Sequence, residues 1–186
     1  MILQKECNYI EDSEIKRGVE AIVAGNEHWY ENYPVSISGK YHKHEPTMEI
    51  HIKRCVYFAR EFIRAFNLST QESDILIAAC ILHDVGLSQV TRSGDVKTEG
   101  WKYYPETGWS RKGNGWDHPI RSSLVIGQKP FKNSRRIQDL VETHMEHWYS
   151  EWCRRPSNLL ECLCAMCDYL ASRENIEVKD IYDKVS

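Results

Sequence analysis

Apolar residues recur at helical spacing through most of the chain, and this pattern predicts a mainly α-helical fold. In residues 13–25, "SEIKRGVEAIVAG", Ile15, Val19 and Ile22 lie on one stripe that ends at Gly25. Comparable stripes occupy residues 48–66, 117–128, 135–148 and 157–172. Because no stretch alternates convincingly between apolar and polar residues, we expect an all-α fold.

The segment 70–82, "TQESDILIAACIL", differs from the others because it is apolar on nearly all sides. Such a helix is expected at the centre of a bundle. Ser69 and Glu72 fit a capping box at its start. The run ends in His83 and Asp84, an adjacent imidazole and carboxylate. A pair of this kind after a buried helix either meets water or binds a charged partner.

Two segments, residues 30–47 and 88–117, lack helical patterning. The second is a long insertion with five Gly and three Trp. A loop of this length in a compact domain is usually functional or disordered, and its aromatic residues argue against disorder. It leaves from the His83–Asp84 helix end and returns at His118, so we expect it to form a lid over a site at these residues.

Composition is typical of one soluble globular domain of 186 residues, with 41% hydrophobic and 27% charged residues. A net charge of −3 argues against a protein that coats nucleic acid. No apolar window is long enough to span a membrane, and no export signal precedes the first helix, so we expect a cytoplasmic protein. Several of the seven cysteines lie inside apolar runs and are interpreted as reduced, small hydrophobic residues.

Six potential metal ligands lie on or beside the apolar stripes of the predicted helices, or at helix ends. They are His51, His83, Asp84, His118, His144 and Asp168. Ionisable groups that converge on one core are costly unless they are paired or bound to metal. A single inward histidine is more often a hydrogen-bonded core residue than a ligand. The ordered set over five predicted helices favours a divalent transition ion, which imidazole and carboxylate suit.

This order of residues resembles the HD-domain superfamily of metal-dependent phosphohydrolases over about residues 34–175. The resemblance is closest to a bacterial and phage branch. It rests on the stretches "PVSISGKYHKHEPTMEIHIKRCV", "ILHDVGL", "DHPIRSSLV", "THMEHW" and "CDYLASREN". It implies an HD-domain helical bundle with a long loop insertion over the metal site. We expect residues 1–186 to form a single HD domain with a helical core at about 48–175.

The resemblance also implies roles for the six ligands. His51, His83, Asp84 and Asp168 match the first metal position, and Asp84 would bridge to a second ion completed by His118 and His144. The cofactor would be one or two divalent ions, drawn from Mn, Fe, Co, Zn, Ni or Mg, with Asp84 and His83 at the reaction centre. The chain departs from the branch at Leu87, where Lys is usual, and at His147, where Gln is frequent.

Substrate contacts are predicted in both non-helical segments. The stretch "SISGKYHKH" is either a solvated loop or a phosphate-binding loop, and its match to the branch favours contacts by Ser38, Lys40 and His42. Arg92 and Lys102 are candidates to meet phosphates, and Trp109 is a candidate to stack on a base. The aromatic residues of the insertion serve equally well to pack it onto the bundle.

Three functions follow from these patterns. The favoured one is a metal-dependent phosphohydrolase acting on a nucleotide as its small-molecule partner. A single-strand 3'-5' exonuclease or phosphodiesterase is the first alternative, and the net acidity of the short chain disfavours nucleic acid. A non-catalytic nucleotide-binding HD protein is the second, and the complete ligand set argues against it. No membrane partner is expected.

Overall fold

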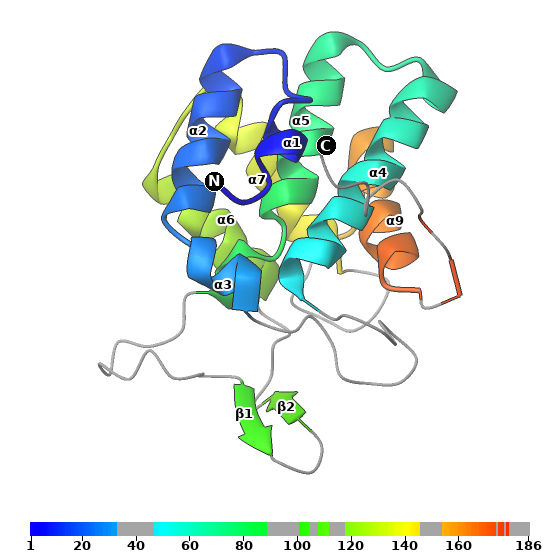
Figure 1. Cartoon of the computed structure of the whole chain (residues 1–186). Coiled ribbons are helices and arrows are strands. Elements are labelled where there is room, and N and C mark those ends of the chain that lie inside the picture. Colours follow the sequence, from blue (N-terminus) through cyan, green and yellow to red (C-terminus); the bar gives the residue numbers. More distant parts are fainter. Residues whose placement is uncertain are drawn as a thin grey trace.

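A helix whose last nine residues are buried forms the centre of the fold. The computed structural model describes residues 1–32, 47–88, 101–104, 108–111, 118–145, 154–173, 175, 176 and 178. In this part of the chain, α5 (Thr70–Leu82) buries every residue from Asp74 to Leu82. It packs against α1, α2, α4, α7 and α9 (Figure 1). The apolar composition of residues 75–82 explains this central place, as the sequence predicted.

The other helices surround α5 on two sides (Figure 1). The long helix α4 (Met48–Phe66) packs against α9 (Leu159–Ala171) on one side, and α6 (His118–Gln128) packs against α7 (Ser134–Thr143) on the other. The N-terminal segment adds α1 (Gln4–Cys7), α2 (Ser13–Ala24) and α3 (Glu27–Asn32). The periodicity predicted α2 but not α1 or α3, which are too short to show a repeating stripe.

Both ends of α5 are fixed by side chains. At its start, the predicted capping box is present between Ser69 and Glu72. Asp74 is buried there and accepts hydrogen bonds from the backbone N–H groups of Glu11 and Asp12, at 2.8 Å each. These bonds hold the segment before α2 against the central helix.

The carboxyl end of α5 stops at Leu82 because side chains satisfy its last carbonyl groups. His83 Nδ1 donates to the carbonyl oxygen of Cys80 at 2.9 Å, and the buried Tyr30 hydroxyl donates to that of Ile81 at 3.1 Å. Carbonyl groups in the last turn of a helix have no intrahelical partner and otherwise need water. The chain then enters a short 3-10 helix, η1 (Val85–Leu87).

One helix end differs from the sequence expectation. Residues 135–148 are predicted as one helix, but α7 ends at Thr143 and His144 is its C-cap. The imidazole Nδ1 of His144 donates to the carbonyl oxygen of Val141 at 2.6 Å, which takes a position that helical continuation would use. The periodicity could not show this ending, because the apolar stripe includes His144 itself.

The all-α prediction is confirmed, with one local exception inside the insertion. Strands β1 (Trp101–Tyr104) and β2 (Gly108–Arg111) form an antiparallel hairpin in which Trp101 pairs with Arg111. We expected only a loop there. Aromatic residues favour strands, and the short segments "WKYY" and "GWSR" gave no clear alternation. Residues 89–100, 105–107 and 112–117 of the insertion lie outside the described part of the chain, as do residues 33–46 of the first non-helical segment.

Six of the seven cysteines are described, and all six are free thiols. Cys55, Cys80, Cys164 and Cys167 are buried among the core helices, as expected for small hydrophobic residues. Among the described helices, none is long and apolar enough to cross a membrane.

The turn after Asp84 depends on a glycine, and this gives a first prediction. A Cβ on Gly86 would lie 2.3 Å from the backbone nitrogen of Ser122 in α6. Gly86→Ala must therefore push η1 and α6 apart, and we expect a loss of about 1–3 kcal/mol in the free energy of unfolding. Urea denaturation measures this loss.

Gly25→Ala is the matched control, since its Cβ would meet nothing nearer than 3.5 Å. We expect Gly25→Ala to change the free energy of unfolding by less than about 0.5 kcal/mol. Equal stability of the two variants would contradict the close approach of η1 and α6.

Candidate metal centre

Five helix ends bring the six predicted ligands together in the interior. His51 lies in the first turn of α4, His118 begins α6 and Asp168 lies near the end of α9. His83 and His144 are the C-caps of α5 and α7, and Asp84 follows His83. The side chains of the four histidines and of Asp84 are at most 7% exposed, and that of Asp168 is 13% exposed.

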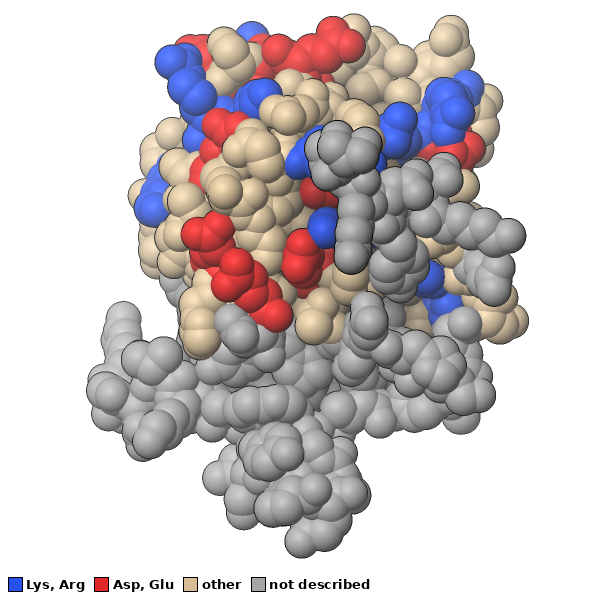
Figure 2. Space-filling view, viewed as in Figure 1, with Lys and Arg blue, Asp and Glu red and all other residues tan. Residues whose placement is uncertain are grey.

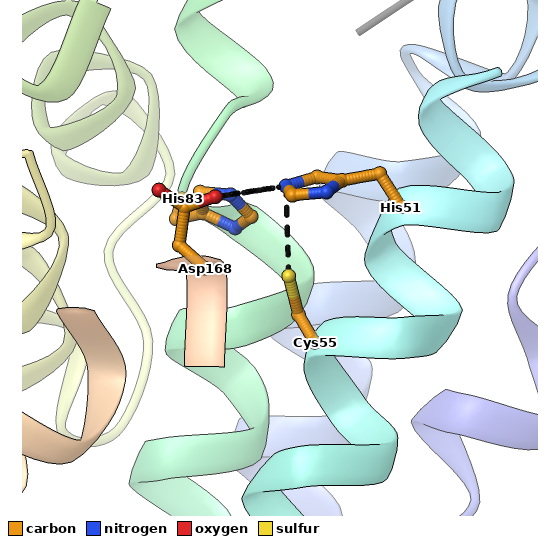
Figure 3. A group of neighbouring side chains, drawn as sticks. All are labelled: His51, Cys55, His83 and Asp168. Atoms are coloured by element: carbon orange, nitrogen blue, oxygen red, sulfur yellow. Dashed lines mark hydrogen bonds and ion pairs between the residues drawn. The ribbon is translucent and has the colours of Figure 1, made fainter. Parts of the chain in front are cut away.

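The first group of side chains centres on His51. Its Nε2 lies 3.1 Å from His83 Nε2 and 3.1 Å from Asp168 Oδ1. His83 Nε2 lies 3.6 Å from the same Asp168 oxygen. Figure 3 shows these three side chains directed toward one another from α4, the end of α5 and α9.

The second group joins the first through Asp84. His118 Nε2 lies 2.9 Å from His144 Nε2, and Asp84 Oδ1 lies 3.0 Å from His118 Nε2 and 3.7 Å from His144 Nε2. The other oxygen, Oδ2, lies 3.4 Å from His83 Nε2 and 3.8 Å from His51 Nε2. One carboxylate therefore turns each of its oxygens toward a different pair of imidazoles.

The hydrogen bonds of two imidazoles show which ring nitrogen carries a hydrogen atom. His83 Nδ1 donates to the carbonyl oxygen of Cys80, and His144 Nδ1 donates to that of Val141. These bonds place a hydrogen on Nδ1, so in the neutral ring each Nε2 bears the lone pair. Each Nε2 faces a carboxylate oxygen and another imidazole nitrogen. Lone pairs that face one another in a dry interior repel unless a cation lies between them.

The spacing of these atoms fits a metal ion. Ligands at 2.0–2.1 Å from a common ion are separated by roughly 3.0–3.4 Å at octahedral to tetrahedral angles. Most of the nitrogen and oxygen contacts fall near this range. Two sets could each hold an ion, with all ligand atoms of a set within 4.8 Å of one another. The first set is His51, Cys55, His83 and Asp168. The second set is His83, Asp84 and His144. His83 belongs to both sets but has one remaining nitrogen, so it can bind only one ion. The residues present therefore fit one divalent ion, and a second one with His118 in place of His83, since His118 Nε2 lies beside His144 and Asp84.

The electrostatics of the cluster also favour a cation. Burial opposes charge, yet the attraction of His83 and His118 holds the pKa of Asp84 well below its usual range. Imidazole hydrogen bonds likewise outweigh burial and lower the pKa of Asp168. The two carboxylates raise the pKa of His83 well above its usual range against the effect of burial, whereas burial lowers that of His144. The lowered pKa values of the two carboxylates and the raised pKa of His83 together favour positive charge beside the carboxylates.

The predicted substrate contacts are not brought to the cluster by the described residues. Ser38, Lys40, His42, Arg92 and His147 lie outside the described part of the chain. Lys102 and Trp109 belong to the hairpin, whose backbone pairs Lys102 with Ser110 and Trp109 with Tyr103. The lid therefore stays a prediction. Leu87 ends η1 and packs against the hydrophobic core.

Sequence reasoning missed a positioning residue, Arg54. Its guanidinium is buried and donates from Nε to the carbonyl oxygen of Ala171 at 2.8 Å. One terminal nitrogen donates to the carbonyl oxygens of Arg173 at 2.9 Å and Ile176 at 2.8 Å. A cation at a helix C-terminus also interacts favourably with the helix dipole. Arg54 therefore fixes the end of α9, and with it Asp168, against α4.

Comparison with known families agrees with this geometry. A family model described as the HD domain matches residues 48–173, which is most of the chain. The chain therefore belongs to the HD domain family, whose members are typically metal-dependent hydrolases. Neither the comparison with curated proteins nor the comparison with solved structures gave a match. The bacterial and phage branch stays a prediction.

We predict that the metal-stripped protein binds at least one equivalent of Mn²⁺ or Co²⁺. His83→Ala should abolish high-affinity binding, because His83 Nε2 faces both carboxylates. His28→Ala, on the exposed side of α3, is the control and should bind as the wild type does. Equilibrium dialysis measures the stoichiometry.

A free metal concentration of 100 times Kd should raise the free energy of unfolding of the wild type by about 2.7 kcal/mol. Absence of bound metal in the wild type would contradict the assignment.

Arg54→Ala is expected to weaken both the fold and metal binding. It removes the donor to three carbonyl groups, so the free energy of unfolding should fall by about 1–3 kcal/mol. Displacement of Asp168 should weaken metal binding by about 10–100-fold. Arg135→Ala is the control, because that side chain is 74% exposed and contacts Asp139 and Gln138 of its own helix. Unchanged metal affinity in Arg54→Ala would show that Arg54 does not position Asp168.

Proposed function

We propose that this protein is a metal-dependent phosphohydrolase that cleaves a phosphomonoester or phosphoanhydride bond of a nucleotide. The observation that carries the proposal is the placement of Asp84. Its two oxygens face two different imidazole pairs, so one carboxylate is positioned to link two ions. Paired ions are suited to displacement at phosphorus, since they activate water and neutralise phosphoryl oxygens when bound.

The residues of the chain prepare the site for such a reaction. The low pKa of Asp84 keeps its carboxylate charged, so it acts as a ligand and hydrogen-bond acceptor rather than as an acid. The bond from His83 to Cys80 fixes the imidazole ring. Leu82 and Val85, next to the pair in the chain, are fully buried, and an interior that excludes water strengthens electrostatic interactions.

The charge of the surface supports a small nucleotide over a nucleic acid. The net charge of the chain is −3. On the face shown in Figure 2, the described residues intermix Lys and Arg with Asp and Glu and form no continuous basic stripe. Nucleic-acid binding depends on such a stripe. The resemblance adds Ser38, Lys40 and His42 as proposed phosphate contacts. From the insertion, Arg92 and Lys102 are proposed to meet phosphates and Trp109 to stack on a base.

A panel of metal-loaded reactions tests the proposal. We expect wild-type protein to release phosphate or a shorter nucleotide from at least one of a set of nucleoside monophosphates, nucleoside triphosphates and dinucleotides, with products identified by mass. Asp84→Asn should lower the rate at least about 100-fold, because it removes a negative ligand shared by both groups. Asp139→Asn makes the same chemical change on α7 and should leave the rate unchanged.

Two results would point to the alternative functions. Progressive shortening of a single-stranded oligonucleotide without turnover of nucleotides would identify an exonuclease. Nucleotide binding without turnover, measured by calorimetry with the metal-loaded protein, would identify a non-catalytic binding protein.

A further inference from the structure

A cysteine adjoins the metal centre and is not among the ligands that the family resemblance implies. Cys55 lies one helical turn after His51 on α4, so both side chains share one face of the helix. Its Sγ lies 3.5 Å from His51 Nε2, and the residue is 1% exposed. Figure 3 shows the sulfur directed at the tip of the His51 ring, beside Asp168 and His83.

We infer that Cys55 is a further metal ligand, which completes a mixed nitrogen, oxygen and sulfur site with His51, His83 and Asp168. The inference rests on the proposed metal centre and deepens it. The ligand atoms of these four residues all lie within 4.8 Å of one another. On coordination, a sulfur–metal bond replaces the S–H bond and the thiol proton leaves to solvent.

The geometry suits a sulfur ligand. With zinc–sulfur and zinc–nitrogen bonds of about 2.3 Å and 2.05 Å, tetrahedral coordination separates sulfur from nitrogen by roughly 3.5 Å. The distance between Cys55 Sγ and His51 Nε2 is 3.5 Å. A plain thiol would instead donate a hydrogen bond to this nitrogen and occupy the lone pair that a metal needs. The two arrangements exclude each other at His51 Nε2, so an experiment can separate them.

A thiolate changes which ions the site prefers. Soft sulfur ligands favour Zn²⁺ and similar transition ions, whereas carboxylate-rich sites suit Mg²⁺ and Mn²⁺. The second group, His118, His144 and Asp84, contains no cysteine. The two positions should therefore differ in preference, with a thiophilic ion at the first and a less selective second position.

Cobalt absorption tests the sulfur bond directly. Full-length protein is stripped of metal and loaded with one equivalent of Co²⁺. We expect a thiolate-to-cobalt charge-transfer band in the near ultraviolet for the wild type and its loss in Cys55→Ser. Cys80→Ala is the matched control, because Cys80 is also 1% exposed but does not belong to either ligand set. It should keep the band.

A second measurement needs no variant and covers the case in which Cys55→Ser fails to fold. X-ray absorption of the zinc-loaded wild type should show one sulfur at about 2.3 Å.

Zinc affinity should fall about 10–100-fold in Cys55→Ser, with Mn²⁺ affinity nearly unchanged.

The outcomes separate this inference from the proposed function. Cobalt binding without a charge-transfer band, or a band that Cys55→Ser retains, overturns the role of Cys55 and leaves the metal centre intact. Absence of cobalt and zinc binding overturns both. A band lost only in Cys55→Ser, together with the sulfur distance, supports the inference.

Discussion

The convergence of lone pairs in a dry space between helix ends is the constraint on which this structure depends. Asp84 and Asp168 remain charged although burial opposes it, and the imidazoles around them present nitrogen lone pairs to the same space. A cation must offset this arrangement, since unpaired buried charge is costly. A divalent ion bound by the imidazoles and carboxylates would do so.

The ending of α5 shows how the fold builds such a site. An apolar helix can be fully buried, but its last carbonyl groups then need donors. Tyr30 supplies one donor from α3 and His83 supplies the other from its own ring. The bond that ends the helix is thus the same bond that aims Nε2 of His83 at the carboxylates. His144 repeats this device at the end of α7.

The sulfur of Cys55 connects the packing of the core to the chemistry of the site. Buried cysteines fill small spaces between helices, and Cys80, Cys164 and Cys167 do so here. Cys55 occupies the same layer, but its position one turn after His51 places its sulfur at the edge of the ligand cluster. One buried cysteine can therefore fill space in the core and also serve as the proposed metal ligand.

The sequence by itself determined the helical class, the central place of residues 70–82 and the inward position of six ionisable side chains, because periodicity and apolar content are local properties. It even predicted the bounds of α4, Met48–Phe66. Only the tertiary structure showed that α7 ends before His144 and that each oxygen of Asp84 faces a different pair of imidazoles. It also showed that Arg54 donates hydrogen bonds to the end of α9. Each depends on contacts between segments far apart in the chain, which no local pattern records. Cys55 lies between the two cases, since its spacing from His51 was visible and its closeness to the ligands was not.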